Sequence, residues 1–243
     1  MIPPVLPYYW DSYSEHLILQ ALAIGASFEP IPAKLWNHWN RFEDEYRAKR
    51  IVYAHSGSLF TYQYAQAFID FRDLDDQGIN YFENSRLATL ANKEFCLEQA
   101  ARHKTYGDLS WGLSAALGPF GYRAYGAKPG QAVHDGTIAP YASAASIVFT
   151  PHASLTTLKH LYQAYGDRLY GMHGFRDSFN LDKDWWAAEY LGIDQGILVL
   201  MIENYLTEGV WKRFMQLQPI QRWIGLCQLK NASSRSIEAA GNK

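Results

Sequence analysis

The sequence predicts an all-α domain, and three observations support this fold class. Apolar residues recur at helical spacing in about eight segments of the chain. Several links between these segments are short, which favours antiparallel neighbouring helices. No period of 20–50 residues is visible, so the helices do not form a sequence-level repeat. We therefore expect a helical toroid or bundle.

The predicted helices have recognisable starts and stops. The first begins at Asp11 or Ser12 and stops at Gly25, and the second opens after Pro30 and Pro32. Residues 50–54 and 170–180 read as short β-like segments. The helices are expected at 10–25, 33–46, 58–71, 81–103, 138–149, 154–165, 191–205 and 210–215, the last continuing after Pro219 to Leu229.

A long glycine-rich connection, residues 104–136, interrupts the helical pattern. A structureless insert of this length inside a compact domain is usually functional or disordered. Its aromatic content argues against disorder. We therefore expect a cleft built from loops and lined with aromatic side chains.

Charge and hydropathy exclude several classes of protein. The 22 basic and 24 acidic residues give a net charge of −2 without a basic run, so we expect no nucleic-acid or anionic-lipid partner. Residues 1–7 lack the features of a signal peptide, and no stretch approaches the ~20 apolar residues of a membrane span. A periplasmic or secreted location would require a signal further upstream.

The common motifs of cofactor and metal chemistry are absent from the sequence. It has no Gly-x-Ser-x-Gly, phosphate-binding glycine loop, Cys-x-x-Cys or His-Glu-x-x-His. The spacing of His152 and His160 does not suit a metal ion. Cys96 and Cys227 read as small core residues. We expect neither a metal nor a cofactor.

The stretch 191–205 is nearly continuously apolar and places Asp194 between two glycines. On a helix, Glu203 points away from Asp194 and lies about 13.5 Å along the axis, so the two acids cannot act as a pair. Gly192 and Gly196 indicate close approach of a ligand or another backbone. The alternative is that Gly192 starts the helix and that Asp194 caps it or interacts favourably with the helix dipole.

Carboxylates among aromatic residues suit a glycoside hydrolase, which needs one acid for the leaving oxygen and one base or nucleophile. The chain holds 8 Trp, 17 Tyr and 12 Phe, whose rings can also pack against sugars. We single out Glu15 and Asp194 as the catalytic pair. Aromatic walls near Glu15 would keep it protonated. The alternative is a capping box in which Glu15 bonds only the backbone of Ser12.

Further residues are candidates for sugar binding. Loop polar groups can reach sugar hydroxyls, and flat rings can stack on a pyranose, although each ring is also a candidate for the core. For the acids that flank Arg72, an internal ion pair is the alternative. The candidates are Asp70, Arg72, Trp111, Tyr122, Arg123, Asp135 and Trp185.

Several motifs, occurring together and in order, carry a resemblance to one family. They are Asp70-Phe-Arg72, Asn80-Tyr-Phe-Glu-Asn-Ser-Arg86, Trp111-Gly-Leu-Ser, Gly121-Tyr-Arg-Ala-Tyr-Gly126, Asp135-Gly-Thr-Ile-Ala-Pro-Tyr-Ala142, Tyr190-Leu-Gly-Ile-Asp-Gln-Gly196 and Met201-Ile-Glu-Asn-Tyr205. From about Trp10 to Leu229 the chain resembles the glycoamylase-like domain of bacterial endo-β-1,2-glucanases (glycoside hydrolase family 144), which is related to a domain of cyclic β-1,2-glucan synthases.

The resemblance implies an (α/α)₆ toroid and hydrolysis of β-1,2-linked glucan with inversion and without a metal. It implies that Glu15 is the general acid and that Asp194 is the base that activates water. The expected partner is an oligo- or polysaccharide of the β-glucan class. The alternatives are a glycan-binding module without turnover, an inactive truncated fragment, and transfer to another sugar.

The chain departs from the family pattern in two places. Upstream helices that close the toroid are missing, so residues 1–230 are expected to be the C-terminal portion of the domain, with a polar tail at 231–243. The incomplete toroid would expose an apolar edge, through which self-association is expected. Residues 117–120, Leu-Gly-Pro-Phe, replace a polar Asp-Gly-Pro-Asp type loop at one wall of the sugar site.

Overall fold

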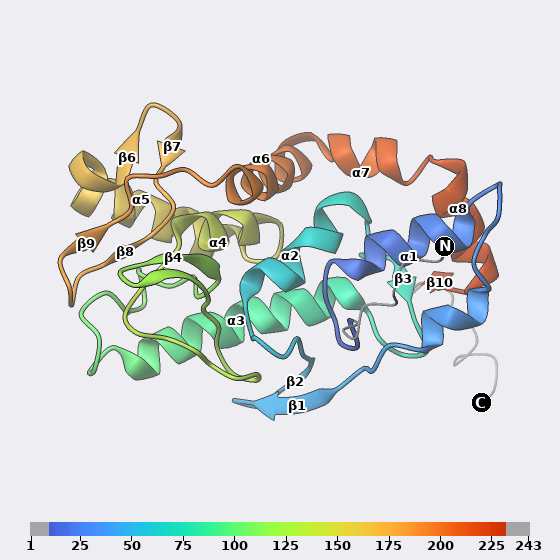
Figure 1. Ribbon diagram of the computed structural model, residues 1–243, viewed down its shortest axis with the longest axis horizontal. Coiled ribbons are helices and arrows are strands. Elements are labelled where there is room, and N and C mark those ends of the chain that lie inside the picture. The colour runs from blue at the N-terminus through green and yellow to red at the C-terminus, as the bar shows by residue number, and fades with distance from the viewer. Residues whose placement is uncertain (1–9, 232–243) are drawn as a thin grey trace, which may run out of the picture.

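A computed structural model describes residues 10–231, and this part of the chain contains eight α-helices. Helix α2 lies between α3 on one side and α6 and α7 on the other (Figure 1). The helices are α1 (His16–Gly25), α2 (Leu59–Phe68), α3 (Tyr81–Gln99), α4 (Pro140–Ala145), α5 (Pro151–Leu169), α6 (Gly192–Thr207), α7 (Gly209–Phe214) and α8 (Gln218–Leu226).

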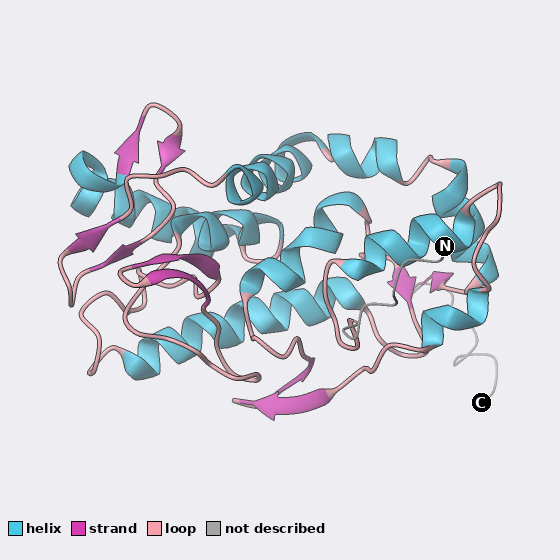
Figure 2. Ribbon diagram, viewed as in Figure 1, coloured by secondary structure: helices cyan, strands magenta, loops and turns pink. Residues whose placement is uncertain are grey.

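Ten short strands form five separate antiparallel pairs in the described residues. They lie in the connections between helices and do not join into one sheet (Figure 2). The pairs are β1 (Glu43–Tyr46) with β2 (Lys49–Val52), β3 (Leu74–Asp75) with β10 (Lys230–Asn231), β4 (Ala115–Gly118) with β5 (Gly121–Ala124), β6 (Tyr170–Gly171) with β7 (Gly174–Phe175), and β8 (Phe179–Asn180) with β9 (Trp185–Trp186).

The predicted number of helices is confirmed, but one predicted helix is wrong. Residues 33–46 form a 3₁₀ turn, η1 (Ala33–Asn37), followed by strand β1. Arg41 donates hydrogen bonds to the carbonyls of Trp36 and Trp39, each at 3.3 Å, and these carbonyls would otherwise serve a continuing helix. The Asn40 amide binds the Asp11 carbonyl at 2.7 Å instead of its own helix. Tertiary contacts therefore override the local pattern.

The structure also divides several predicted segments into shorter elements. The connection 104–136 contains the hairpin β4–β5, and the segment 138–149 divides into α4 and a 3₁₀ turn, η2 (Ser146–Val148). Segment 210–229 divides into α7 and α8. Residue 231 belongs to β10, while the rest of the predicted tail lies outside the described residues.

The predicted stop of the first helix at Gly25 is confirmed, and the structure explains it. A side chain at Gly25 would place its Cβ 1.7 Å from the Pro219 carbonyl oxygen of α8. Only glycine permits this approach, by which α1 packs directly on α8. Cys96 is buried in α3 as predicted, and Cys227 is half-buried directly after α8.

Helix α2 contributes to both hydrophobic clusters of the core. Leu59, Phe60 and Ala67 belong to the cluster around Trp111 and α6, and Tyr62, Ala65 and Ile69 belong to the cluster around Trp36 and α8. Because α2 is enclosed, its polar side chains need internal partners. Gln63 donates to the Ala142 carbonyl at 2.7 Å, and Gln66 donates to the Tyr81 carbonyl at 2.8 Å.

Asp76 is the centre of a buried polar network beside η1. Its Oδ2 accepts hydrogen bonds from Arg41 at 2.7 Å, from the Tyr81 hydroxyl at 2.7 Å and from the Trp36 indole N–H at 3.1 Å. Only 3% of its side chain is exposed. This network holds the turn that replaces the predicted helix.

Across residues 10–231, no helix has the length and apolar character needed to cross a bilayer.

Asp76→Ala is expected to lower the free energy of unfolding by about 3–5 kcal/mol, because it leaves a largely buried guanidinium without its counter-charge. Urea unfolding followed by circular dichroism measures the change. Asp73→Ala is the matched control, because Asp73 is an exposed acid three residues earlier. Its effect should be below about 0.5 kcal/mol. Equal effects of the two substitutions would contradict this account of the network.

Candidate functional site

Three carboxyl groups from distant parts of the chain act on the same tyrosine. Glu15 directly precedes α1, Asp177 lies between β7 and β8, and Asp194 is in the first turn of α6. Burial raises the pKa of the Tyr122 hydroxyl, and the negative charges of Asp194, Asp177 and Glu15 raise it further. Tyr122 lies on β5 and is 57% exposed. The candidate pair therefore shares one region, with an aromatic ring open to solvent.

Asp194 is fully buried, and within residues 10–231 no donor forms a well-aligned hydrogen bond to either of its carboxyl oxygens. Burial raises its pKa to about 8, and the neighbouring Asp177 carboxyl adds to this effect. The Tyr141 hydroxyl has the opposite effect and lowers the pKa of Asp194. The start of a helix normally favours the ionised carboxylate, but burial and the second acid outweigh the helix dipole here. Asp194 therefore binds a proton more readily than an ordinary aspartate does.

Asp177 is a site residue that the sequence did not reveal. It is fully buried, and its Oδ2 accepts a hydrogen bond from the Leu117 amide at 2.7 Å. Burial raises the pKa of Asp177, and this hydrogen bond opposes the rise. The residue falls in a segment that reads only as β-like, so no periodicity marks it. The sequence offers one indication: Asp177 lies between two phenylalanines, Phe175 and Phe179, which suggests that it is buried.

Tyr141 on α4 completes the surroundings of Asp194. It is 1% exposed, and its hydroxyl donates to the Ala115 carbonyl at 2.7 Å and lies 2.8 Å from Ser114 Oγ, from which it can accept. The charge of Asp194 raises its pKa beyond the large effect of burial. Tyr141 therefore fixes the wall next to Asp194 while its own proton is engaged elsewhere.

Glu15 does not form the capping box that was the alternative to a catalytic role. Helix α1 begins at His16, so Glu15 is the N-cap residue, and its side chain makes no capping hydrogen bond. Its Oε2 is buried and has no hydrogen-bond partner in the described part of the chain, residues 10–231. A buried carboxyl oxygen without a structural partner is uncommon and requires an explanation. The carboxyl group of Glu15 therefore has no capping role in α1.

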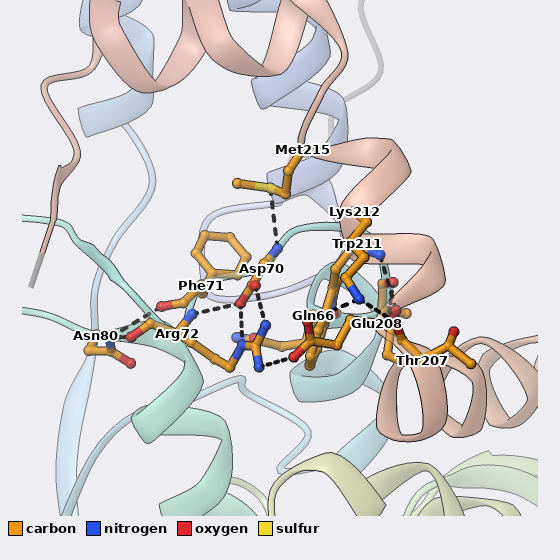
Figure 3. Close-up of polar contacts among 12 residues, drawn as sticks. Gln66, Asp70, Phe71, Arg72, Asn80, Thr207, Glu208, Trp211, Lys212 and Met215 are labelled. Atoms are coloured by element: carbon orange, nitrogen blue, oxygen red, sulfur yellow. Dashed lines mark hydrogen bonds and ion pairs between the residues drawn. The ribbon is translucent and has the colours of Figure 1, made fainter.

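Asp70 and Arg72 do not join this region. Arg72 binds both carboxyl oxygens of Asp70 at 2.8 and 2.7 Å and reaches Glu208 at 2.7 Å (Figure 3). Its guanidinium lies 4.5 Å from the ring centroid of Trp211. Glu208 is fourteen residues from Asp194 along α6, or about 21 Å. The ion-pair alternative therefore fits these residues, which link the end of α2 to the α6–α7 junction.

Three of the remaining candidates for sugar binding are buried, half-buried or engaged in hydrogen bonds within the fold. Trp111 is fully buried in the core cluster, so it offers no surface for stacking. Asp135 Oδ1 accepts a hydrogen bond from the Thr137 hydroxyl at 2.6 Å and thereby closes its own loop. Trp185 is half-buried in β9. In contrast, Arg123 is exposed on β5 next to Tyr122.

The two glycines near Asp194 face open space. Gly192 is the first residue of α6, which agrees with the prediction that it starts the helix. Side chains at Gly192 and Gly196 would meet nothing within 4 Å, so no described residue approaches them closely. The predicted close contact with another backbone is therefore wrong within residues 10–231.

The candidate site is distinct from a large cavity elsewhere in the described residues. That cavity has a volume of about 520 Å³ and is lined by Trp36, Asp76 and Cys227 among others. None of its lining residues belongs to the Glu15–Asp177–Asp194 region.

No cluster of His, Cys, Asp and Glu within residues 10–231 is suited to hold a metal ion.

The fold and site define a predominantly helical domain with buried carboxyl groups beside an exposed aromatic ring. The chain belongs to the family described as “Putative glucoamylase”, which matches residues 7–218. It is 30% identical over 237 residues to an exo β-1,2-glucooligosaccharide sophorohydrolase of Parabacteroides distasonis, covering 87% of this chain and 33% of that protein. The predicted family resemblance is confirmed.

Solved structures give the same relationship. An endo-β-1,2-glucanase from Chitinophaga pinensis, in complex with sophorotriose and glucose, matches with a TM-score of 0.83 and 31% identity. The match covers 88% of this chain and 54% of that one. A β-1,2-glucanase from Parabacteroides distasonis matches with a TM-score of 0.82 and 29% identity, over 89% of this chain and 34% of the other. This chain therefore spans between a third and about half of these relatives.

Asp194→Asn is expected to stabilise the protein at alkaline pH. The pKa of Asp194 is about 8 in the folded state against an ordinary value of 3.8, so the folded state binds the extra proton between these values. The free energy of unfolding of the parent protein therefore falls as pH rises through this range. The uncharged amide of Asp194→Asn does not titrate, so the variant avoids this loss. At pH 8 we expect the Tm to rise by roughly 3 °C or more, with almost no difference near pH 4.

Thermal unfolding of both proteins across this pH range measures the effect. Asp167→Asn is the control, because Asp167 is an exposed acid on α5. It should leave the pH dependence unchanged. An Asp194→Asn variant that is less stable than the parent at pH 8 would contradict the raised pKa of Asp194.

Proposed function

We propose that this chain is the catalytic portion of a glycoside hydrolase that cleaves β-1,2-linked glucan. The observation that carries the proposal is the unpartnered burial of Glu15 Oε2 and of both Asp194 oxygens next to exposed Tyr122. Leaving such groups unpaired costs stability, which a role in binding or chemistry explains. The linkage is taken from the relatives, which are a β-1,2-glucooligosaccharide sophorohydrolase and two β-1,2-glucanases.

In this proposal Glu15 protonates the leaving glycosidic oxygen and Asp194 accepts a proton from the attacking water. Hydrolysis with inversion follows, because the water attacks the anomeric carbon from the face opposite the leaving group. No metal or cofactor takes part. Tyr122 offers its ring to a glucose unit, and Arg123 offers donors to sugar hydroxyls.

The proposed fold is the C-terminal portion, residues 1–230, of an (α/α)₆ toroid. Support comes from the TM-scores of 0.83 and 0.82 to chains of which the match covers 54% and 34%. Helix α6 is apolar on all sides, yet Ile193, Val199 and Leu206 are 54–69% exposed. A helix of this composition is normally enclosed. We infer that its outer face is the open edge, available to the remaining helices or to a second copy of the chain.

Glu15→Gln and Asp194→Asn should each lower the rate of β-1,2-glucan hydrolysis by roughly 100-fold or more, because each removes a proton-transfer group. Reducing ends released from linear β-1,2-glucan measure the rate, and product chain lengths separate hydrolysis from transfer to another sugar. Asp70→Asn is the control, since its ion pair lies at the far end of α6, and it should retain most of the activity. Full activity in either of the first two variants would reject the assigned roles.

A second candidate function is glycan binding without turnover. It is favoured by the fact that the chain spans only 54% of the Chitinophaga glucanase. Calorimetric binding of β-1,2-gluco-oligosaccharides without product would support it, and sedimentation would detect self-association through α6. Product formation at the rate of a complete relative would exclude this alternative.

A further inference from the structure

The buried carboxyl groups of Asp177 and Asp194 form a pair, and neither of them makes an ion pair with a cationic side chain within residues 10–231. Both residues are fully buried, and they come from the β7–β8 loop and from α6. A side-chain hydrogen bond joins the two carboxyl groups. Because an ionised carboxylate only accepts hydrogen bonds, one member of the pair must carry the proton. Asp177 Oδ1 and both oxygens of Asp194 accept no well-aligned hydrogen bond from any other described donor. Two ionised carboxylates in this position would repel each other without compensation.

The hydrogen-bond donors around the pair are already engaged. The Ser178 hydroxyl donates to the Leu117 carbonyl at 2.6 Å, and its distance to Asp177 Oδ2 is 3.4 Å. The Tyr141 hydroxyl donates to the Ala115 carbonyl at 2.7 Å. The Leu117 amide binds Asp177 Oδ2 at 2.7 Å, and of the groups that act on Asp194 the Tyr141 hydroxyl has the smallest effect. A proton between the carboxyls is the remaining way to satisfy their free oxygens.

We propose that Asp177 and Asp194 share one proton and that Asp177 is the positioning residue that sets the protonation of Asp194. The amide of Leu117 stabilises negative charge on Asp177, so the proton resides on Asp194 and is donated to Asp177. The catalytic consequence rests on the proposed function above. Asp194 can accept a proton from water only after the shared proton has left the pair, so loss of that proton to solvent precedes turnover.

The charged and titratable groups facing the pair come from several elements. Tyr141 of α4 and Tyr122 of β5 face Asp194, while Glu189 adds a negative charge near Asp177. Glu15 acts on the same Tyr122 hydroxyl. None of these groups is a cation, so the surroundings favour retention of the proton. The pKa of about 8 for Asp194 agrees with this geometry.

Asp177→Asn tests the proposal while keeping the local contacts. The substituted side chain retains an oxygen to accept the Leu117 N–H, and its amide can donate to Asp194. The Asp194 carboxylate then gains a donor and loses a neighbouring charge. The midpoint of the rising limb of kcat/KM against pH should fall by about 1 pH unit or more. Ser178→Ala should leave the midpoint within a few tenths of a unit, because its hydroxyl proton is engaged by Leu117.

A second measurement does not depend on activity. Infrared spectra of the substrate-free chain between pH 5 and pH 9 should show one protonated carboxyl that loses its proton near pH 8. The signal should be absent from Asp194→Asn and should move to lower pH in Asp177→Asn. A parent protein without this signal, or an unchanged midpoint in a folded Asp177→Asn variant, would overturn the shared proton. Catalytic inactivity combined with the signal would instead reject only the proposed function.

Discussion

The enclosure of α2 is the constraint on which the arrangement of the other helices depends. This helix contacts α1, α3, α4, α6 and α7, so its own polar side chains must bind groups from its neighbours. Gln63 binds the backbone of α4, and Gln66 binds the start of α3. The Trp211 indole N–H of α7 in turn binds the Gln66 carbonyl at 2.6 Å. These bonds have direction, whereas apolar contacts between helices do not, and they therefore fix how the helices align.

The same constraint positions the candidate site. Helix α4 carries Tyr141, and its attachment to Gln63 places that ring beside the first turn of α6. At the other end of α6, Asn204 donates to the Ala67 carbonyl of α2 at 2.8 Å. Asp194 is therefore held by a helix that is bound near both ends. Buried acids in such a rigid setting keep perturbed proton affinities, because the surroundings cannot rearrange to solvate the charge.

Much of the fold was predictable from the sequence, because helix formation depends on periodicity and on local stop signals. Asp194 could be singled out because an acid between glycines interrupts an apolar helix. Asp177 could not, since its burial results from Leu117 and α6, which are far away in the sequence. The helix predicted over 33–46 failed for the same reason: Arg41 is committed to Asp76, thirty-five residues later. Contacts between distant segments decide what local patterns leave open.

The ion pair between Arg72 and Glu208 is one of two attachments of the C-terminal end of α6. It joins this end to the segment after α2, about 21 Å from Asp194. The hydrogen bond from Asn204 to the Ala67 carbonyl holds the same end of the helix to α2. Loss of the ion pair alone therefore leaves α6 attached, and the carboxyl groups at its other end keep their position.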